Sequence, residues 1–341
     1  MNKKALGLLV ALSLGAIAGC GNNNSTSSSA TVAEKYSVGL GYTESFKAGQ
    51  LDVTTAFAAF DKDGKVFDVR FDVVQVKFTA NEAKDGLTLT NTNIDADYSV
   101  TTKLELGSAY NMQGSSYIGK EVNEQIEAFA DFCVGKTVEE VIAATVNPGH
   151  SSDGTPVCDD LAGKVTITVD AFEAALSKAY ATKSETTYEL SGTAGVAMKS
   201  GLAYNYDKPT KELDVTVAGA FAKDGKVEVA LFDSVIYPVA IAEDGTTSTD
   251  TSSKYIKDGR VVSKKDLGDD YAMRPASPIK AEWDEQAAVI EAACAGKTAD
   301  QIKALVAGEG ELAGATMTVN SYLTAIAKAA VYAEKAVIND K

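Results

Sequence analysis

Residues 59–66 have the sequence Ala-Phe-Asp-Lys-Asp-Gly-Lys-Val, and residues 220–227 repeat it as Ala-Phe-Ala-Lys-Asp-Gly-Lys-Val. In both copies the Asp-Gly pair lies between apolar runs that are rich in β-branched and aromatic residues. Asp and Gly tolerate the positive φ of a tight turn, so this pattern is typical of a β-hairpin. We predict paired strands at 51–60 and 66–78, and again at 215–221 and 227–239.

The repeat continues downstream at the same spacing of 161 residues. Its matched positions include Leu106-Gly107 with Leu267-Gly268, Tyr110 with Tyr271, Met112 with Met273, Glu124-Gln125 with Glu285-Gln286, and Cys133 with Cys294. Upstream, residues 39–42 match residues 201–204 with one residue of slip. Self-similarity over this length predicts two copies of one domain, which we place at 34–185 and 186–341.

Helices are predicted after the strands of each copy. In the first copy, apolar side chains at 122, 126, 129 and 133 share one helical face, and Gly135 ends the helix. Three pairs have the spacing of a capping box, which starts a helix: Thr137 with Glu140, Thr298 with Gln301, and Asp170 with Glu173.

A short strand and a closing helix are expected at the end of each copy. The strands are placed at 165–169 and 316–319, and the helices begin at Asp170 and Asn320. The predicted fold class is therefore α+β, with two tandem homologous domains, each a mainly antiparallel sheet with flanking helices.

The amino-terminal residues indicate export and lipid attachment. Two lysines precede an apolar run that is too short for a permanent membrane span, and the run ends Ile-Ala-Gly-Cys. We interpret 1–19 as a lipoprotein signal peptide and Cys20 as the lipidated residue, although an ordinary secretory peptide remains the alternative. The Asn, Ser and Thr residues within 20–33 predict a flexible tether. The expected location is the extracellular face of the cell membrane.

The composition excludes several classes of function. The net charge is −15, and no basic stripe exists to bind nucleic acid. The single histidine, His150, excludes a multi-histidine metal site and offers no neighbour for a catalytic triad. No phosphate-binding loop or dinucleotide fingerprint is present. Besides Cys20 the chain has Cys133, Cys158 and Cys294, without any CxxC motif. Packing of the repeated cysteine in a helix interface, a redox role for it, and a Cys133–Cys158 disulfide all remain open.

One stretch near the carboxyl terminus offers a candidate for chemistry. Residues 311–318 are Glu-Leu-Ala-Gly-Ala-Thr-Met-Thr, in which small residues precede a threonine. The first copy places Leu-Ala-Gly at 161–163 and a threonine at 166, with one extra residue between them. Both copies therefore carry a threonine at the same point of the domain.

The segment Gly314-Ala315-Thr316 resembles the Ser/Thr-Gly-Ala-Thr flavinylation motif of FMN-binding domains. Together with the duplication and the lipoprotein-like start, it resembles the tandem FMN-binding lipoproteins of the PplA-like group. The resemblance implies that a flavin transferase takes FMN from FAD, with magnesium, and joins its phosphate to Thr316. Modification of Thr166 stays open, because the first copy has one extra residue and no alanine before its threonine. Leu312, Gly314, Ala315 and Gly163 would shape the two turns. Ala313 departs from the motif, as does Gly310, where the family usually has aspartate.

The repeated aromatic and sulfur side chains are candidates for the flavin wall: Tyr271, Met273, Tyr110 and Met112. Core packing is the alternative role for them. The resemblance implies a surface-anchored electron carrier rather than a catalyst of a substrate reaction, since flavin moves one or two electrons without protein acid–base groups. Its implied electron donor is a membrane quinol or dehydrogenase, and its implied acceptor is ferric iron or another extracellular oxidant. The alternative is a non-redox lipoprotein that binds a solute or polymer between its two domains.

Overall fold

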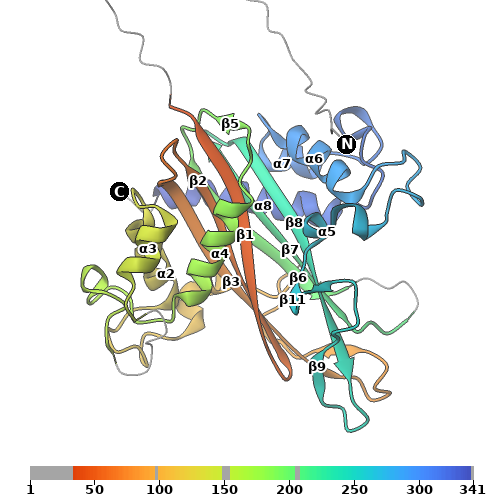
Figure 1. Cartoon of the computed structure of the whole chain (residues 1–341), viewed down its shortest axis with the longest axis horizontal. Coiled ribbons are helices and arrows are strands. Elements are labelled where there is room, and N and C mark those ends of the chain that lie inside the picture. Colours follow the sequence, from red (N-terminus) through yellow and green to blue (C-terminus); the bar gives the residue numbers. More distant parts are fainter. Residues whose placement is uncertain (1–33, 97–98, 148–153, 204–207, 339–341) are drawn as a thin grey trace, which may run out of the picture. The chain divides into compact units, whose positions relative to one another are not determined.

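The computed structural model describes residues 34–96, 99–147, 154–203 and 208–338. Residues 34–341 form one compact unit (Figure 1). The predicted signal peptide, Cys20, the predicted tether and His150 lie outside the described residues. Within them, no helix has both the length and the apolar character needed to cross a membrane.

The first repeat consists of a β-meander followed by helices. Its strands and helices are β1 (Tyr36–Lys47), β2 (Gln50–Phe60), β3 (Val66–Ala80), β4 (Leu87–Leu89), α1 (Lys103–Leu106), α2 (Val122–Cys133), α3 (Val138–Ala144) and α4 (Asp170–Ala181). The short strand β5 (Thr187–Tyr188) pairs with β1 and completes an antiparallel sheet in the order β4-β3-β2-β1-β5.

The second repeat has the same order of elements. They are β6 (Thr193–Leu202), β7 (Glu212–Lys223), β8 (Lys226–Ile241), β9 (Thr247–Thr249), a small hairpin of β10 (Ile256–Lys257) and β11 (Arg260–Val261), α5 (Lys264–Leu267), α6 (Trp283–Cys294), α7 (Ala299–Lys303) and α8 (Asn320–Ile338). Strands β6 to β9 form a second antiparallel sheet in sequence order. The α+β class with antiparallel sheets is therefore confirmed, whereas the division into two domains stays a prediction.

The hairpin prediction is correct in both repeats. In the second repeat Asp224 and Gly225 both have positive φ, at 50° and 77°, and they join Lys223 directly to Lys226. In the first repeat Gly64 has a φ of 77° within a longer loop. The capping boxes of Thr137 and Thr298 are present at the start of α3 and α7. The four apolar residues predicted to share a face of α2 are all buried.

The predicted capping box of Asp170 and Glu173 is wrong. The residue before α4 is Val169, and it makes no side-chain cap, so Asp170 is the first helical residue. The Glu173 carboxylate instead accepts a hydrogen bond from the hydroxyl of Thr145. The Glu173 side chain therefore makes a tertiary contact with Thr145 instead of the helix cap that the local pattern predicted.

The upstream match of residues 39–42 with 201–204 is also wrong. Phe60 and Phe221 are equivalent in the repeat, and they pair with Ser37 and Ala194 respectively. The strand equivalent to β1 is therefore β6, with Ser37 matching Ala194, and Gly201 lies near its far end. Neither β1 nor β6 was predicted as a strand.

Glycines explain why these two strands were missed. A Cβ at Gly39 would lie 1.9 Å from the carbonyl oxygen of Ala179 on α4, and one at Gly195 would lie 2.1 Å from that of Ala329 on α8. Glycine in a strand marks a close backbone approach, and here it allows each closing helix to lie directly on its sheet. The same glycines weaken the sequence signal for a strand.

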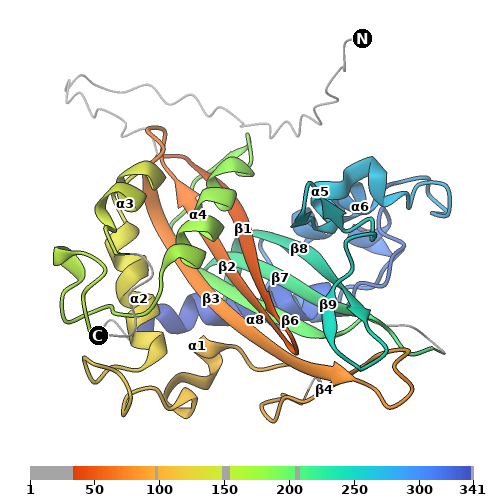
Figure 2. The same cartoon turned by 60° about the horizontal axis from the view of Figure 1, so that its bottom comes forward.

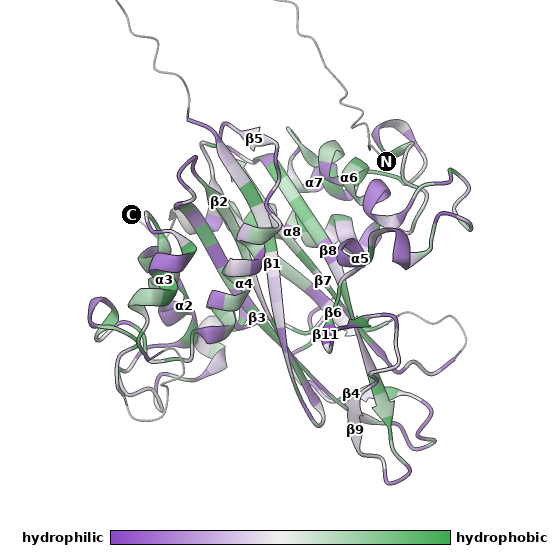
Figure 3. Ribbon diagram, viewed as in Figure 1, coloured by the Kyte–Doolittle hydropathy of each residue, from purple (hydrophilic) through white to green (hydrophobic). Residues whose placement is uncertain are grey.

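The sheets of the two repeats pack against each other, with helices outside them. Valines of β2, β3, β7 and β8 form one shared buried cluster, and Phe57 and Phe221 belong to another, with ring centroids 5.2 Å apart. Helix α4 packs on β1 and β2, and α8 packs on β6 and β7 (Figure 2). Figure 3 shows the hydrophobic residues along β7 and β8 that supply much of this interior.

Each closing helix also forms an ion pair with the other repeat. Lys178 of α4 lies 2.7 Å from Asp266 of α5, and Lys328 of α8 lies 2.5 Å from Glu105 of α1. The two lysines are equivalent at a spacing of 150 residues, and the two acids at 161. The repeats therefore exchange the same contact in both directions, which the sequence of a single repeat does not reveal.

A buried carboxylate fixes the start of the first short helix in each repeat. Asp72 Oδ1 accepts hydrogen bonds from the N–H groups of Val73 and Leu104, at 2.7 and 3.1 Å. The equivalent Asp233 accepts from Ser234 and Lys265, at 2.7 and 3.2 Å. Burial raises the pKa of Asp72 to about 7 and the pKa of Asp233 to about 6, and the hydrogen bonds oppose this only in part.

These raised pKa values predict that stability falls as the pH rises. An unfolded aspartate has a pKa near 3.9, so between about pH 4 and 7 the folded state holds a proton that the unfolded state has lost. The free energy of unfolding should therefore decrease across this interval. In an Asp72→Asn variant, the loss of unfolding free energy between these pH values should be smaller by up to about 4 kcal/mol. Urea unfolding at pH 4.5 and 7.5 measures the difference, with the exposed Asp63→Asn as control. An unchanged pH slope in Asp72→Asn would contradict the assignment.

Candidate functional site

The turn before Thr316 is a short 3-10 segment (Gly310–Leu312) that leads into an irregular chain. The side chain of Leu312 is fully buried, and so is Ala315, whose N–H donates to the Leu312 carbonyl at 2.9 Å. Gly314 has little room for a side chain, because a Cβ there would lie 3.1 Å from Val289 of α6. Small residues thus bring the backbone close to α6 and place Thr316 immediately after the turn.

The strands predicted at 165–169 and 316–319 are absent from both repeats. In the second repeat, Oε1 of Gln286 accepts the N–H groups of Thr316 and Met317, at 2.8 and 3.2 Å. Gln125 does the same for Thr166 and Ile167 in the first repeat, at 2.8 and 3.2 Å. The backbone donors that a strand would use in a ladder are satisfied by one buried side chain instead.

These two glutamines also contact the threonine hydroxyls. The distance from Oγ1 to the amide oxygen is 3.4 Å for Thr316 and Gln286, and 3.3 Å for Thr166 and Gln125. The opposite end of each amide donates to a serine hydroxyl at 3.3 Å, which is Ser277 in one repeat and Ser116 in the other. Both glutamines are fully buried. Each one therefore has a defined orientation and holds its threonine in place.

Sequence reasoning missed the part played by Gln125 and Gln286. The signal was present, because the Glu-Gln pair recurs at the spacing of 161 residues. Nothing in the linear sequence connects a residue on α2 with a threonine 41 positions later.

The two threonines differ in accessibility. Thr316 is exposed, whereas Thr166 is buried, with 4% of its surface accessible. The extra residue in the first repeat changes the turn, since Gly163 has a φ of 70° whereas Gly314 is not in the left-handed region. The N–H groups of Lys164 and Val165 both donate to the carbonyl of Leu161 and close the turn. Of these two threonines, only Thr316 of the second repeat is exposed to solvent.

The candidate wall residues are half-buried and pack on the core of their own repeat. One of them contacts the glutamine that holds Thr316, since Nε2 of Gln286 lies 3.7 Å from the sulfur of Met273. The ring of Tyr271 instead lies beneath Lys254, whose ammonium is 4.3 Å from the ring centroid. Tyr110 and Met112 occupy the equivalent positions in the first repeat.

In each repeat, a glutamate carboxylate accepts backbone hydrogen bonds from the loop that carries these residues. Glu282 accepts the N–H groups of Met273 and Arg274, at 2.9 and 2.7 Å. Glu121 accepts those of Met112 and Gln113 in the same way, at 2.9 and 3.0 Å. The recurrence of Tyr-x-Met therefore reflects a loop that is anchored to the start of α6 or α2.

The same loop contains a strained alanine. Ala272 has a φ of 64°, and the equivalent Asn111 has a φ of 61°. Left-handed backbone costs alanine about 1 kcal/mol, whereas asparagine tolerates it better. Ala272→Asn is expected to stabilise the protein by roughly 0.5–1 kcal/mol, and Asn111→Ala to destabilise it by a similar amount. Both positions are exposed, so packing changes little. Urea unfolding measures both variants, and shifts of the same sign would contradict this explanation.

The cysteines are packed inside the protein as thiols. Cys133, Cys158 and Cys294 are free and buried, so the structure has no Cys133–Cys158 disulfide. Burial raises the pKa of Cys294 to about 12 and also raises the pKa of Cys133. A protonated thiol in the interior favours the packing role over a redox role. Within the described residues, no group of three or more His, Cys, Asp and Glu residues could hold a metal ion.

Comparison with known proteins adds one partial similarity. No family model matches the chain, and no solved structure matches it. A chlorophenol reductase from Desulfitobacterium hafniense is 35% identical over 97 residues. This segment is 27% of the present chain and 29% of that protein, so the chain spans less than a third of the relative's length. The similarity does not establish a family.

Proposed function

We propose that this protein is an electron carrier whose FMN is joined through a phosphoester to Thr316. The observation that carries the proposal is the position of Thr316, an exposed residue that follows a turn of small residues and whose backbone N–H is held by the buried Gln286. A hydroxyl that must enter the active site of a modifying enzyme needs both accessibility and a defined position.

The attachment needs a transferase, FAD and magnesium. The Thr316 oxygen forms a new bond to the FMN phosphorus, the phosphoanhydride bond of FAD breaks, and AMP leaves, while the hydroxyl proton passes to solvent. Gln286 acts as a positioning residue in this step. Its amide oxygen orients the threonine, and an amide is too weak a base to remove the proton.

The bound flavin would supply one- and two-electron transfer. The residues on this chain would anchor its phosphate and shield part of its ring. Met273, which lies beside Gln286, could shield part of the ring. The first N–H groups of α8, which begins at Asn320, could donate hydrogen bonds to the phosphate. Because Thr316 is exposed, the flavin would lie near the surface. Such exposure suits exchange with a membrane quinol or dehydrogenase and with an extracellular acceptor such as ferric iron.

The test is co-expression of the full chain with a flavin transferase. The purified protein is denatured, separated on a gel and inspected for flavin fluorescence, and its intact mass is measured. We expect one flavin per chain that stays with the denatured polypeptide. Absence of flavin, or flavin that is released on denaturation, would overturn the proposal.

A further inference from the structure

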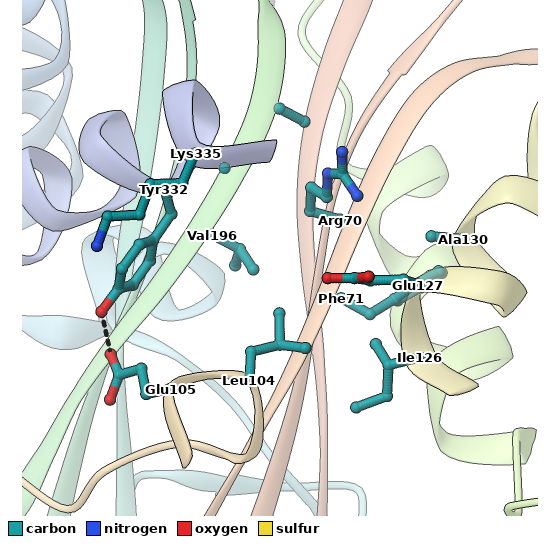
Figure 4. Close-up of a pocket in the computed structure, with 12 residues that line it drawn as sticks. Arg70, Phe71, Leu104, Glu105, Ile126, Glu127, Ala130, Val196, Tyr332 and Lys335 are labelled. Carbon is teal, nitrogen blue, oxygen red and sulfur yellow. Dashed lines mark hydrogen bonds between the residues drawn. The ribbon is translucent and has the colours of Figure 1, made fainter. Parts of the chain in front are cut away.

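A cavity of about 290 Å³ lies between the two repeats, away from both threonines. It opens between the edge of β3 and strand β6 and is bounded by α1, α2 and α8 (Figure 4). Phe71, Leu104, Ile126 and Val196 supply an apolar wall. Arg70, Glu105, Glu127, Tyr332 and Lys335 supply polar groups. Apolar walls with a few polar groups are typical of sites for small organic ligands.

The second repeat shows what fills the corresponding space there. At the spacing of 161 residues, Lys265 stands in place of Leu104 and Glu291 in place of Ala130. Lys265 and Glu291 form an ion pair. The Glu291 carboxylate also accepts the backbone N–H of Phe232, at 2.8 Å. In the first repeat Ala130 has no carboxylate to offer Phe71, the residue equivalent to Phe232.

The first repeat has a cation at a position where the second repeat has an apolar residue. Arg70 stands in place of Leu231. Its Nε is buried and has no hydrogen-bond partner among the described residues. An unpaired buried donor of a charged group is costly, so an acceptor placed against it gains a strong, charge-assisted hydrogen bond. Lys335 adds a second positive charge at the cavity.

We infer that this cavity binds a small organic carboxylate with an apolar body about the size of one ring. The ligand's carboxylate takes the place that Glu291 fills in the second repeat and accepts hydrogen bonds on the Arg70 side. Its ring lies against Phe71, Leu104 and Ile126. The inference is independent of flavin at Thr316.

Two acidic residues also line the cavity. Glu105 is already compensated, since it accepts from the hydroxyl of Tyr332 at 3.0 Å and pairs with Lys328. The Glu127 carboxylate points into the cavity in Figure 4. Simple aromatic monocarboxylates and aromatic amino acids both carry the carboxylate and the ring that the site requires.

The experiment titrates the full chain with phenylacetate, phenylalanine and the neutral phenylacetamide by isothermal titration calorimetry. We expect one site for phenylacetate, phenylalanine or both, and binding of phenylacetamide that is weaker by roughly tenfold or more, because it lacks the charge. Failure of both carboxylates to bind, or equal binding of the amide, would overturn the inference.

Variants locate the site. The Leu104→Lys/Ala130→Glu double variant rebuilds the ion pair of the second repeat inside the cavity and should weaken binding by at least roughly tenfold. Arg70→Gln should weaken binding by a similar factor and is the safeguard if the double variant folds poorly. Lys265→Leu/Glu291→Ala alters the equivalent place in the second repeat and should leave the affinity unchanged. Wild-type affinity in both cavity variants would contradict the location.

Discussion

The Thr316→Ala variant is expected to carry no covalent flavin after co-expression with a flavin transferase, whereas Thr166→Ala should retain the full wild-type load. The two threonines have the same glutamine contact, with N–H to Oε1 distances of 2.8 Å in both repeats. They differ in exposure, because Thr166 is buried with 4% of its surface accessible and Thr316 is exposed. A transferase that acts on the folded protein should therefore reach only Thr316.

Flavin fluorescence of the denatured band and intact mass measure this outcome. Thr318→Ala is a matched control, because Thr318 is an exposed threonine two residues further on. It should keep one flavin. If Thr166→Ala halves the load, both repeats are modified, and the turn of the first repeat must open before modification. If Thr316→Ala keeps a full load, the assignment of the site is wrong.

The Gly41→Ala variant is expected to lose stability by several kcal/mol. A Cβ at Gly41 would lie 2.0 Å from the carbonyl oxygen of Ala175 and 2.3 Å from the backbone nitrogen of Ala179, both on α4. Backbone atoms within a packed helix cannot rotate out of the way as a long side chain can. Overpacking of this kind costs about 1–3 kcal/mol, and more when the backbone must move. Helix α4 would have to shift away from β1.

Urea unfolding of the two proteins at one pH measures the loss. Gly114→Ala is the control, because a Cβ there meets nothing within 4 Å and its φ is not positive. Its midpoint should equal that of the wild type. A Gly41→Ala variant with an unchanged midpoint would show that α4 does not need this close approach.

Local features of the chain were predicted correctly because short-range physics decides them. The Asp-Gly turns follow from the φ values that these residues tolerate, and the capping boxes of Thr137 and Thr298 involve residues three positions apart. The buried face of α2 follows from helical periodicity. The internal repeat allowed each of these patterns to be read twice. It also directed attention to Thr166 and Thr316 as equivalent points.

The errors concern contacts between residues distant in the chain. Strand β1 was missed because Gly39 and Gly41 weaken its local signal, and only the position of α4 explains them. The strand at 316–319 was wrongly predicted because a β-branched run has strand propensity. That propensity cannot show that Gln286 takes the backbone donors instead. Glu173 was assigned to a helix cap, but its carboxylate accepts a hydrogen bond from the hydroxyl of Thr145 instead.

The sequence by itself determined the Asp-Gly turns, the buried face of α2, the starts of α3 and α7, and the existence of two equivalent threonines, since each depends on residues that are near in the chain or on its self-similarity. Only the tertiary structure decided that Thr316 is exposed and Thr166 is not, and that the two repeats share a core. It also decided that Arg70 lines a cavity in the first repeat, and that the ion pair of Lys265 and Glu291 lies at the equivalent place in the second repeat. The exposure of a residue and the shape of a cavity depend on contacts between side chains that are distant in the chain. Composition and local spacing do not reveal these contacts.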